Sequence, residues 1–144
     1  MSKPIFVING PNLNLLGTRE PEVYGTQTLD DIKELCTKTA QTFGRDVTFV
    51  QSNIEGELID FIQQAGREAV GIVINPAAYT HTSVAIHDAL KAIEVPSIEI
   101  HLSQPAKRES FRRRSYVGEA VHVTISGFGA DSYVLGLQAL SNLI

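Results

Sequence analysis

The chain has 144 residues, of which 43% are hydrophobic and 19% are charged, so we expect a single globular domain over residues 1–144 with one core. The formal net charge of -4 argues against non-specific nucleic-acid binding. No apolar run approaches the ~20 residues of a membrane-spanning helix, and Met1–Pro4 leads into a predicted strand without the pattern of a secretory signal. The single cysteine, Cys36, cannot form an internal disulfide, which favours a cytoplasmic protein.

The first third of the chain predicts a strand, a long loop, a helix and a second strand. Pro4–Asn9 is apolar and predicts a buried strand. The apolar residues of Thr28–Phe43 recur with helical spacing, with Thr28 as N-cap and Gly44 as the end signal. The β-branched and aromatic run Val47–Gln51 predicts the second strand.

The remaining elements repeat the alternation of helix and strand. Ser52 and Glu55 match a capping box that opens a second helix. A third helix carries apolar residues from Val84 to Ile93, and a last one is capped by Asp131 or Ser132. The three further predicted strands are Val70–Ile74, Pro96–Ile100 and Ala120–Ile125. This alternation predicts an α/β doubly wound, five-stranded parallel sheet of flavodoxin-like order 2-1-3-4-5, with helices on both faces.

The segment Ile8–Gly25 stays irregular after the first strand and contains three Asn, one Arg and one Tyr among Gly and Pro. Long irregular loops in compact domains are usually binding loops or lids. We expect Asn9–Leu16 to form a fixed turn. We expect Gly17–Gly25 to form a lid that carries Arg19 and Tyr24.

Polar side chains gather where the predicted strands end. Ligands of such sheets bind beyond the carboxyl ends of the strands, so this rim is the expected site. Amides and guanidinium groups suit a small hydroxyl-rich anion, and the backbone N–H groups of Leu102 and Ser103 can hold a carboxylate. The side chains at this rim are Asn9, Asn12, Asn14, Asn53, Asn75, His81, Glu99, His101, Ser103, Arg108 and Arg112.

Tyr24 and Arg19 share the predicted lid. A cation within a few Å lowers the pKa of a tyrosine. For Tyr24 the expected cations are Arg19 in the same loop and Arg108 or Arg112 across the rim. A tyrosinate can then take a proton from the carbon next to a ketone. An Asn-bound water stabilises the enolate that forms.

Several chemistries lack their sequence signals. The loop after the first strand is neither a dinucleotide fingerprint nor a Walker loop, the histidines show no metal-ligand spacing, and no lysine ends a strand as a Schiff-base nucleophile would. Arg112-Arg113-Arg114 suits a solvated face, a subunit contact or, least well, an RNA patch. The residues alone therefore predict a small polar ligand and leave an enzyme or a non-catalytic flavodoxin-like binding module open, although such a module should carry a phosphate cradle or an acidic cluster.

The order of motifs resembles the type II 3-dehydroquinate dehydratases. The likeness extends along the whole chain and is carried by INGPNLNLLGTREPEVYG at residues 8–25, QSNIEGELID at 51–60, INPAAYTHTSV at 74–84, IEIHLS at 98–103, RESFR at 108–112 and GFG at 127–129. It implies a lyase that removes water from 3-dehydroquinate by anti elimination through an enolate, with no metal, imine or cofactor. A dehydratase of a related cyclic keto acid is the alternative, and the sequence leaves open whether the reaction serves aromatic biosynthesis or quinate breakdown.

The resemblance also implies roles for individual residues. Tyr24 is the expected base, Arg19 the lid arginine, Asn12 the holder of the enolate-stabilising water, and His101 the proton donor to the departing hydroxyl. Glu99 orients His101, and Arg108 lowers the pKa of Tyr24. The expected substrate contacts are Asn75, His81, Asp88, Leu102, Ser103 and Arg112.

The family assembles as a dodecamer of four trimers, so the resemblance implies a homododecamer in which Asp88 reaches a neighbouring subunit's site. No nucleic-acid or membrane partner is implied. The chain departs from the family pattern at Ala77, where Gly is common, at Gln104, where Asn is frequent, and at Ile54. Because Ala restricts φ more than Gly does, we expect the loop at Ala77 to shift slightly.

Overall fold

The five predicted strands form one parallel sheet in the predicted order, β2-β1-β3-β4-β5. The structure, a computed structural model, describes residues 2–18, 22 and 26–144. Its strands are β1 (Ile5–Asn9), β2 (Val47–Gln51), β3 (Gly71–Asn75), β4 (Ser97–His101) and β5 (Val123–Ser126). All neighbouring strands run parallel, and Asn9 at the end of β1 lies level with Asn75 at the end of β3.

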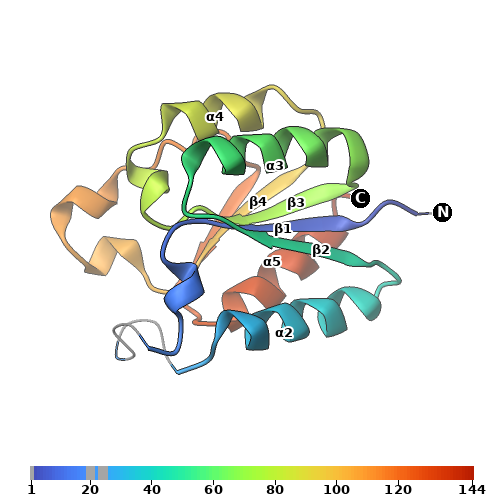
Figure 1. Ribbon diagram of the computed structural model, residues 1–144, viewed down its shortest axis with the longest axis horizontal. Coiled ribbons are helices and arrows are strands. Elements are labelled where there is room, and N and C mark those ends of the chain that lie inside the picture. Colours follow the sequence, from blue (N-terminus) through green and yellow to red (C-terminus); the bar gives the residue numbers. More distant parts are fainter. Residues whose placement is uncertain (1, 19–21, 23–25) are drawn as a thin grey trace.

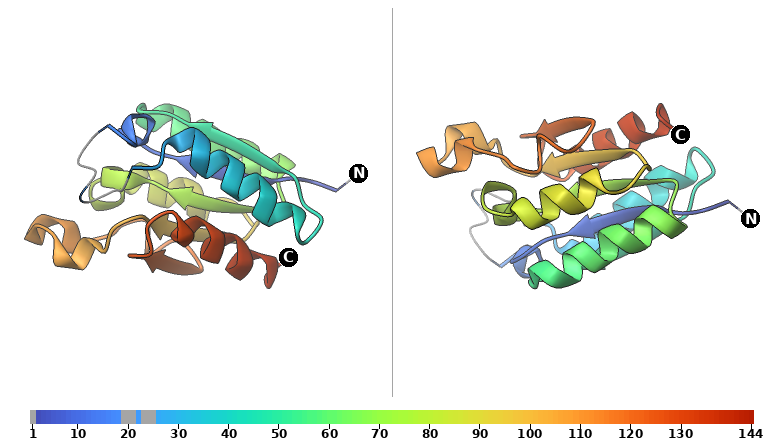
Figure 2. Two further views of the ribbon diagram at one scale, coloured as in Figure 1. Left: turned by 90° about the horizontal axis from the view of Figure 1, so that it is seen from below. Right: turned by 90° about the horizontal axis from the view of Figure 1, so that it is seen from above.

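Two helices cover each face of the sheet. Figure 1 shows α3 and α4 above it and α2 and α5 below it, and Figure 2 shows each pair face on. The helices that cover the sheet in the described part of the chain are α2 (Leu29–Gln41), α3 (Glu55–Glu68), α4 (Val84–Lys91) and α5 (Asp131–Ser141). Among the described residues, four short 3-10 helices lie in the loops: η1 (Leu13–Leu15), η2 (Ala77–His81), η3 (Pro105–Lys107) and η4 (Ser110–Arg113). Within the described residues, no helix has the length and apolar character that crossing a bilayer requires.

The alternating side chains of the central strands divide the core into two layers. Ile5 and Val7 of β1 join the cluster under α2 and α5, whereas Phe6 and Ile8 join the cluster under α3 and α4. Every residue of β1, β3 and β4 is buried. Full burial of one such apolar side chain contributes roughly 1.5–3 kcal/mol, so these strands form a rigid platform, in which Glu99 of β4 is the one polar side chain away from the strand ends.

The first predicted helix cap is confirmed, together with a reciprocal partner. Thr28 Oγ1 accepts a hydrogen bond from the Asp31 N–H, and the Asp31 carboxylate accepts one from the Thr28 N–H, each 3.1 Å long. Gly44, with φ of +75°, follows the end of α2 as predicted, because glycine adopts this left-handed conformation without strain.

The other two predicted caps are wrong. The residue before α3 is Ile54, which has no side-chain cap, because the Ser52 hydroxyl accepts a hydrogen bond from the Ile54 N–H and donates one to Glu57. Helix α5 begins at Asp131 without a side-chain cap, and the Ser132 hydroxyl accepts the Phe128 N–H instead. In both places the hydroxyl stabilises the turn that precedes or enters the helix.

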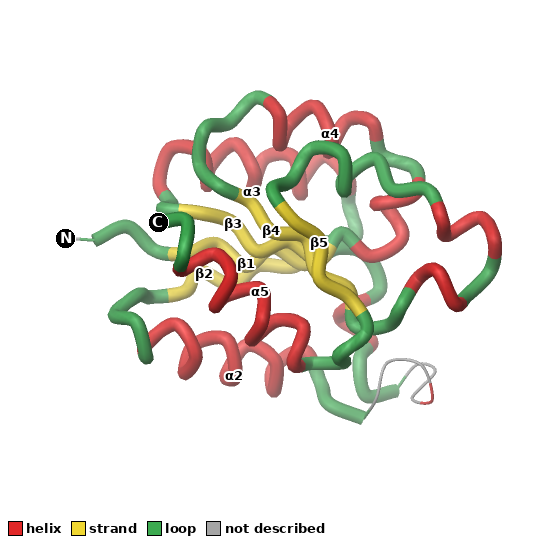
Figure 3. Tube along the Cα trace, turned by 180° about the vertical axis from the view of Figure 1, so that it is seen from behind, coloured by secondary structure: helices red, strands yellow, loops and turns green. Residues whose placement is uncertain are grey.

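The bounds of four strands also differ from the prediction: β1 begins at Ile5 instead of Pro4, and β4 covers Ser97–His101 instead of Pro96–Ile100. Strand β3 extends to Asn75, and β5 begins at Val123 instead of Ala120. Residues 117–122 form turns whose apolar members, Val117 above all, pack into the layer under α3 and α4. β5 is thus a short edge strand, visible at the near side of the sheet in Figure 3.

The loops after β1 and β3 touch at the point where the strand order reverses. The Gly10 N–H donates to the Asn75 carbonyl at 2.8 Å, and a Cβ on Gly10 would lie 2.5 Å from the Pro76 carbonyl oxygen. Only glycine permits this approach. Ligand sites of doubly wound sheets form at such a reversal, and both chain termini lie at the opposite end of the sheet (Figure 1).

Ala77 adopts a left-handed backbone, with φ of +52°, at the start of η2. A Cβ in this region costs roughly 1–2 kcal/mol, which exceeds the extra unfolded-state entropy of glycine, about 0.4–1 kcal/mol. We therefore predict that Ala77→Gly raises the free energy of unfolding by about 0.5–1 kcal/mol, measured by urea denaturation. Ala78→Gly, at an exposed neighbour without positive φ, should lower it; equal effects of the two substitutions would contradict the strain at Ala77.

Candidate active site

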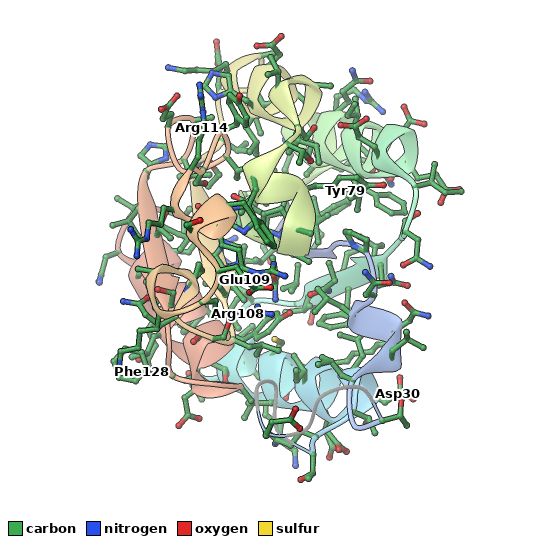
Figure 4. All side chains as sticks on the ribbon, turned by 90° about the vertical axis from the view of Figure 1, so that its left-hand side faces the viewer. Asp30, Tyr79, Arg108, Glu109, Arg114 and Phe128 are labelled. Atoms are coloured by element: carbon green, nitrogen blue, oxygen red, sulfur yellow. The ribbon has the colours of Figure 1, made fainter. Side chains whose placement is uncertain are left out.

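A pocket opens at the carboxyl ends of β1, β3 and β4. Its polar wall carries amide, imidazole and guanidinium groups, and its apolar wall comes from η1 and η2. Figure 4 views this rim, with Arg108 and Glu109 on the 104–116 segment that projects toward the viewer. The lining residues are Pro11, Asn12, Leu13, Leu15, Leu16, Asn75, Ala77, Ala78, His81, His101, Leu102, Ser103, Pro105, Arg108 and Arg112.

Most of the site residues predicted from the sequence line this one pocket, namely Asn12, Asn75, His81, His101, Leu102, Ser103, Arg108 and Arg112. Glu99 is buried behind His101, one strand residue removed from it. Asp88 is exposed on α4 and is not part of the lining. Arg19 and Tyr24 lie outside the described residues, as does most of the predicted lid.

His101 is held by a buried carboxylate. Its Nε2 lies 2.6 Å from Glu99 Oε2, and the side chain of Glu99 is wholly inaccessible while His101 is 8% exposed. Since an ionised carboxylate only accepts hydrogen bonds, Nε2 carries a proton and donates a hydrogen bond to Glu99. Nδ1 is then the ring nitrogen left to exchange a proton with a ligand.

Three hydroxyl groups share Glu99 with His101. Thr80 Oγ1 donates to Glu99 Oε2, Thr124 Oγ1 donates to Oε1 at 2.9 Å, and Ser115 Oγ lies 3.5 Å from Oε2. Burial alone would raise the pKa of Glu99, but the hydrogen bonds from His101, Thr80 and Thr124 outweigh it and hold the pKa below its ordinary value. Glu99 is therefore an anion at neutral pH.

His81 is neutral and oriented by the backbone. Its Nδ1 donates to the Arg114 carbonyl at 2.7 Å. Burial lowers the pKa of His81, and the nearby charges of His101 and Arg112 lower it further, against the raising effect of the Arg114 carbonyl. The neutral ring presents Nε2 as an acceptor, which suits a ligand hydroxyl.

Two arginines make the mouth of the pocket positive. Arg112 Nε donates to Glu109 at 2.9 Å, which lowers the pKa of that carboxyl, and its guanidinium stacks 4.9 Å from the centre of the Phe111 ring. Arg108 Nη1 donates to Ser103 Oγ at 3.4 Å and lies near the same glutamate. Both side chains are thus positioned before a ligand arrives, as an anionic substrate requires.

Asn75 is fixed by a buried tyrosine that sequence reasoning missed. The Tyr133 hydroxyl accepts from Asn75 Nδ2 at 3.1 Å and donates to Asn9 Oδ1 at 2.6 Å, while Asn75 Oδ1 accepts the Ala77 N–H. Burial raises the pKa of Tyr133, so its hydroxyl stays neutral. The sequence does contain a signal for this network, because Tyr133 lies four residues before Leu137 on the buried stripe of α5. A buried tyrosine hydroxyl needs a polar partner, so this spacing predicts one.

Asn12 starts η1 in a left-handed conformation, with φ of +69°. Its N–H donates to Asn53 Oδ1 at 2.9 Å, and Gln51 Nε2 donates to the same oxygen at 3.2 Å. The end of β2 thus positions the turn after β1, and the predicted fixed turn carries its asparagine into the pocket. Among residues 2–18, 22 and 26–144, no group of three His, Cys, Asp or Glu side chains gathers to hold a metal ion.

The sequence profile of the family Dehydroquinase class II matches residues 3–141. This chain belongs to that family. It is 61% identical over 143 residues to the 3-dehydroquinate dehydratase of Phenylobacterium zucineum (strain HLK1), which covers 99% of both chains. It is 57% identical to that of Rhizobium meliloti (strain 1021), over 99% of this dehydroquinase and 97% of its relative.

Solved structures agree with the fold of this dehydroquinase. The crystal structure of the type II dehydroquinase from Propionibacterium acnes matches with a TM-score of 0.94 at 44% identity, covering 99% of this chain and 98% of that one. The type II dehydroquinase from Butyrivibrio crossotus gives 0.94 at 39% identity, covering 97% and 98%. The fold, the family and the enzyme class predicted from the sequence, a type II 3-dehydroquinate dehydratase, are confirmed; the roles of single residues stay predictions.

The ionisation of Glu99 predicts an acid-sensitive fold for this dehydroquinase. Because its folded-state pKa is below the ordinary 4.5, its stabilising contribution is complete above that pH and is lost as the pH falls through the folded value. The lowered pKa of His81 adds a second loss of stability, which begins at a higher pH, as the pH falls below the ordinary histidine pKa of 6.5. Urea denaturation at successive pH values should show both decreases. Glu99→Gln should remove most of the decrease in stability that occurs at the lower pH. If that decrease is unchanged in the variant, it does not come from Glu99.

Proposed function

We propose that this dehydroquinase converts 3-dehydroquinate to 3-dehydroshikimate and water by anti elimination through an enolate, with residues 1–144 acting as one catalytic domain. Tyr24, as tyrosinate, takes a proton from the carbon next to the ketone, and the C–H electrons form the enolate. The enolate collapses back to the ketone and expels the hydroxyl, which leaves as water with a proton from His101. Proton exchange with solvent then restores the tyrosinate and the imidazolium.

The hydrogen bond between His101 and Glu99 at the pocket carries this proposal. A buried carboxylate stabilises the imidazolium that must donate a proton, and it leaves Nδ1 for the departing hydroxyl. A histidine that only stabilised the fold would not need to line a pocket rich in donors. No lysine takes part, so no imine forms during the elimination.

The base and the lid arginine are proposed from their positions in the 8–25 motif. Tyr24 has an ordinary pKa near 10, so it needs cations to act as a base at neutral pH. Arg19 supplies one from the lid. Arg108, which lines the pocket, supplies another, and two cations within a few Å lower a tyrosine pKa by roughly 1–3 units.

The rest of the pocket suits the other groups of the substrate. Asn12 holds the water that stabilises the enolate oxygen, and Asn75 lies beside His101. The Leu102 and Ser103 N–H groups bind the carboxylate. Arg112 and the acceptor nitrogen of His81 bind ring hydroxyls, which the lining and the orientation of His81 support.

We also propose a cytoplasmic homododecamer, a tetramer of trimers, in which Asp88 completes a neighbour's site. Asp88 is exposed on α4 and outside the lining of its own pocket. The same helix exposes Val84, and the projecting η4 exposes Phe111 at 65%. The proposed assembly would bury these two side chains. The single buried thiol, Cys36, whose pKa burial raises to about 12, suits a reducing compartment.

The activity is tested by incubating purified protein with 3-dehydroquinate and recording the absorbance of the conjugated enone. Tyr24→Phe should lower kcat by about 10²–10⁴-fold, because the base is lost. Tyr116→Phe is the matched control, since the ring of Tyr116 stacks on Arg114, 4.3 Å from its guanidinium, and phenylalanine keeps this contact.

No turnover by folded wild-type protein would refute the dehydratase proposal, and parallel assays of related cyclic keto acids would identify another substrate. Substantial activity of Tyr24→Phe would show that another group is the base. Borohydride with substrate present should leave the enzyme active; covalent trapping at a lysine would instead indicate an imine.

The proposed assembly is tested by sedimentation, which should give a mass close to twelve times the 15.7 kDa of one chain. Asp88→Asn should raise KM about 10-fold while the assembly stays intact, because a charge-assisted hydrogen bond to the substrate is lost. Asp60→Asn, an exposed acid on α3, is the control. A fully active monomer would contradict the role of Asp88.

A further inference from the structure

The hydroxyl groups around Glu99 form a chain with one direction. The Gly118 N–H donates to Ser115 Oγ at 2.8 Å, and Ser115 Oγ lies 2.7 Å from Thr80 Oγ1. Thr80 has one hydroxyl proton, which points at Glu99 Oε2, so the proton between the two hydroxyls comes from Ser115. Each member of the chain is therefore set to donate toward the carboxylate.

The two oxygens of Glu99 face donors only. Oε2 accepts hydrogen bonds from Thr80 and His101, and Oε1 accepts one from Thr124. A protonated Glu99 would lose the charge to which Thr80 and Thr124 donate, and hydrogen bonds to a charged acceptor are stronger than those to a neutral one. The hydroxyls therefore favour the anion, and the anion in turn keeps the proton of His101 on Nε2.

We infer that Thr80, supported by Ser115 and assisted by Thr124, is a positioning residue that keeps Glu99 ionised and thereby makes Nδ1 of His101 the proton-exchanging nitrogen. Thr80 is the principal member because it is 1% exposed, whereas Thr124 lies on the exposed edge strand β5, where water can replace its hydroxyl. Without the hydroxyl of Thr80, the shared proton shifts toward Glu99. His101 then faces the substrate as a neutral Nδ1–H ring, which is a weak acid.

This inference rests on the proposed role of His101, but the ionisation of Glu99 is measurable without turnover. The other titratable or charged groups that line the pocket around the pair are the neutral His81 on η2, Arg112 and Arg113 on η4, and Arg108, and a substitution at Thr80 leaves all of them in place. Changes in the titration of Glu99 are therefore assigned to the lost hydroxyl.

The first measurement is an infrared titration of the buried carboxyl, whose band is identified by its loss in Glu99→Gln. Thr80→Val keeps the size of the side chain and removes one hydrogen bond to a charged group, so Glu99 should become protonated about 1–2 pH units higher than in the wild type. Thr80→Ser restores the hydroxyl and should titrate like the wild type. Thr124→Val should give a smaller shift. The control is Thr39→Val on α2, which should give no shift because the Thr39 hydroxyl donates to the Leu35 carbonyl.

The second measurement is kinetic. Thr80→Val should lower kcat about 10–100-fold with KM nearly unchanged, as is usual when a partner that orients a reacting group is lost, and Thr80→Ser should recover most of it. Raised acid sensitivity of kcat should accompany the titration shift. A neutron crystal structure of the wild type should show deuterium on Nε2 of His101 and none on Glu99.

The two proposals fail in different ways. Unaltered titration of Glu99 in folded Thr80→Val, or deuterium on Glu99 in the wild type, would overturn the role of Thr80. A shifted titration in a protein that does not turn over 3-dehydroquinate would support the role of Thr80 and reject the dehydratase function. A loss of kcat that Thr80→Ser does not restore would also overturn the inference, because it would show that the hydroxyl is not the group that matters.

Discussion

A carboxylate buried on a strand has to be compensated, and the surroundings of the site follow from how Glu99 meets this requirement. An unpaired buried charge costs several kcal/mol, so its partners must all be in place when the fold forms. They come from separate segments: His101 on β4 itself, Thr80 on η2, Ser115 after η4 and Thr124 on β5. The same contacts that stabilise the charge therefore hold His101, the proposed proton donor, and connect the loops around the pocket.

The parallel sheet limits where chemistry can occur. Its central strands are buried on both faces, so their other polar side chains lie at the strand ends, and Glu99 in the middle of β4 is the exception whose charge is paired. At the reversal of strand order, Gly10 lets the loops after β1 and β3 touch, and Tyr133 connects Asn9 to Asn75 from below. Asn9 and Asn75 are thereby positioned by the rigid part of the protein. The proposed base belongs instead to the loop that joins β1 to α2.

The sequence predicted the elements better than their ends. Thr28 caps α2 because its partner at the third helical position, Asp31, is local. Ser52 matched the same pattern but bonds to Glu57, since a hydroxyl near several donors and acceptors is not assigned by spacing alone. Val117 joins the core of the α3 and α4 layer, and this long-range packing shortened the predicted β5. Hydrophobic alternation is a local signal, whereas these differences arise from contacts between distant segments.

By itself, the sequence determined the doubly wound sheet, the rim at which the functional groups gather and, through its motifs, the family. Each of these depends on periodicity or on the order of residues along the chain. Only the tertiary structure decided that Glu99 is ionised, that His81 is neutral and that the Thr80 hydroxyl faces Glu99 beside His101. The physical reason is that ionisation depends on burial and on hydrogen-bond partners, and the partners of Glu99 other than His101 are 16 to 25 residues away along the chain.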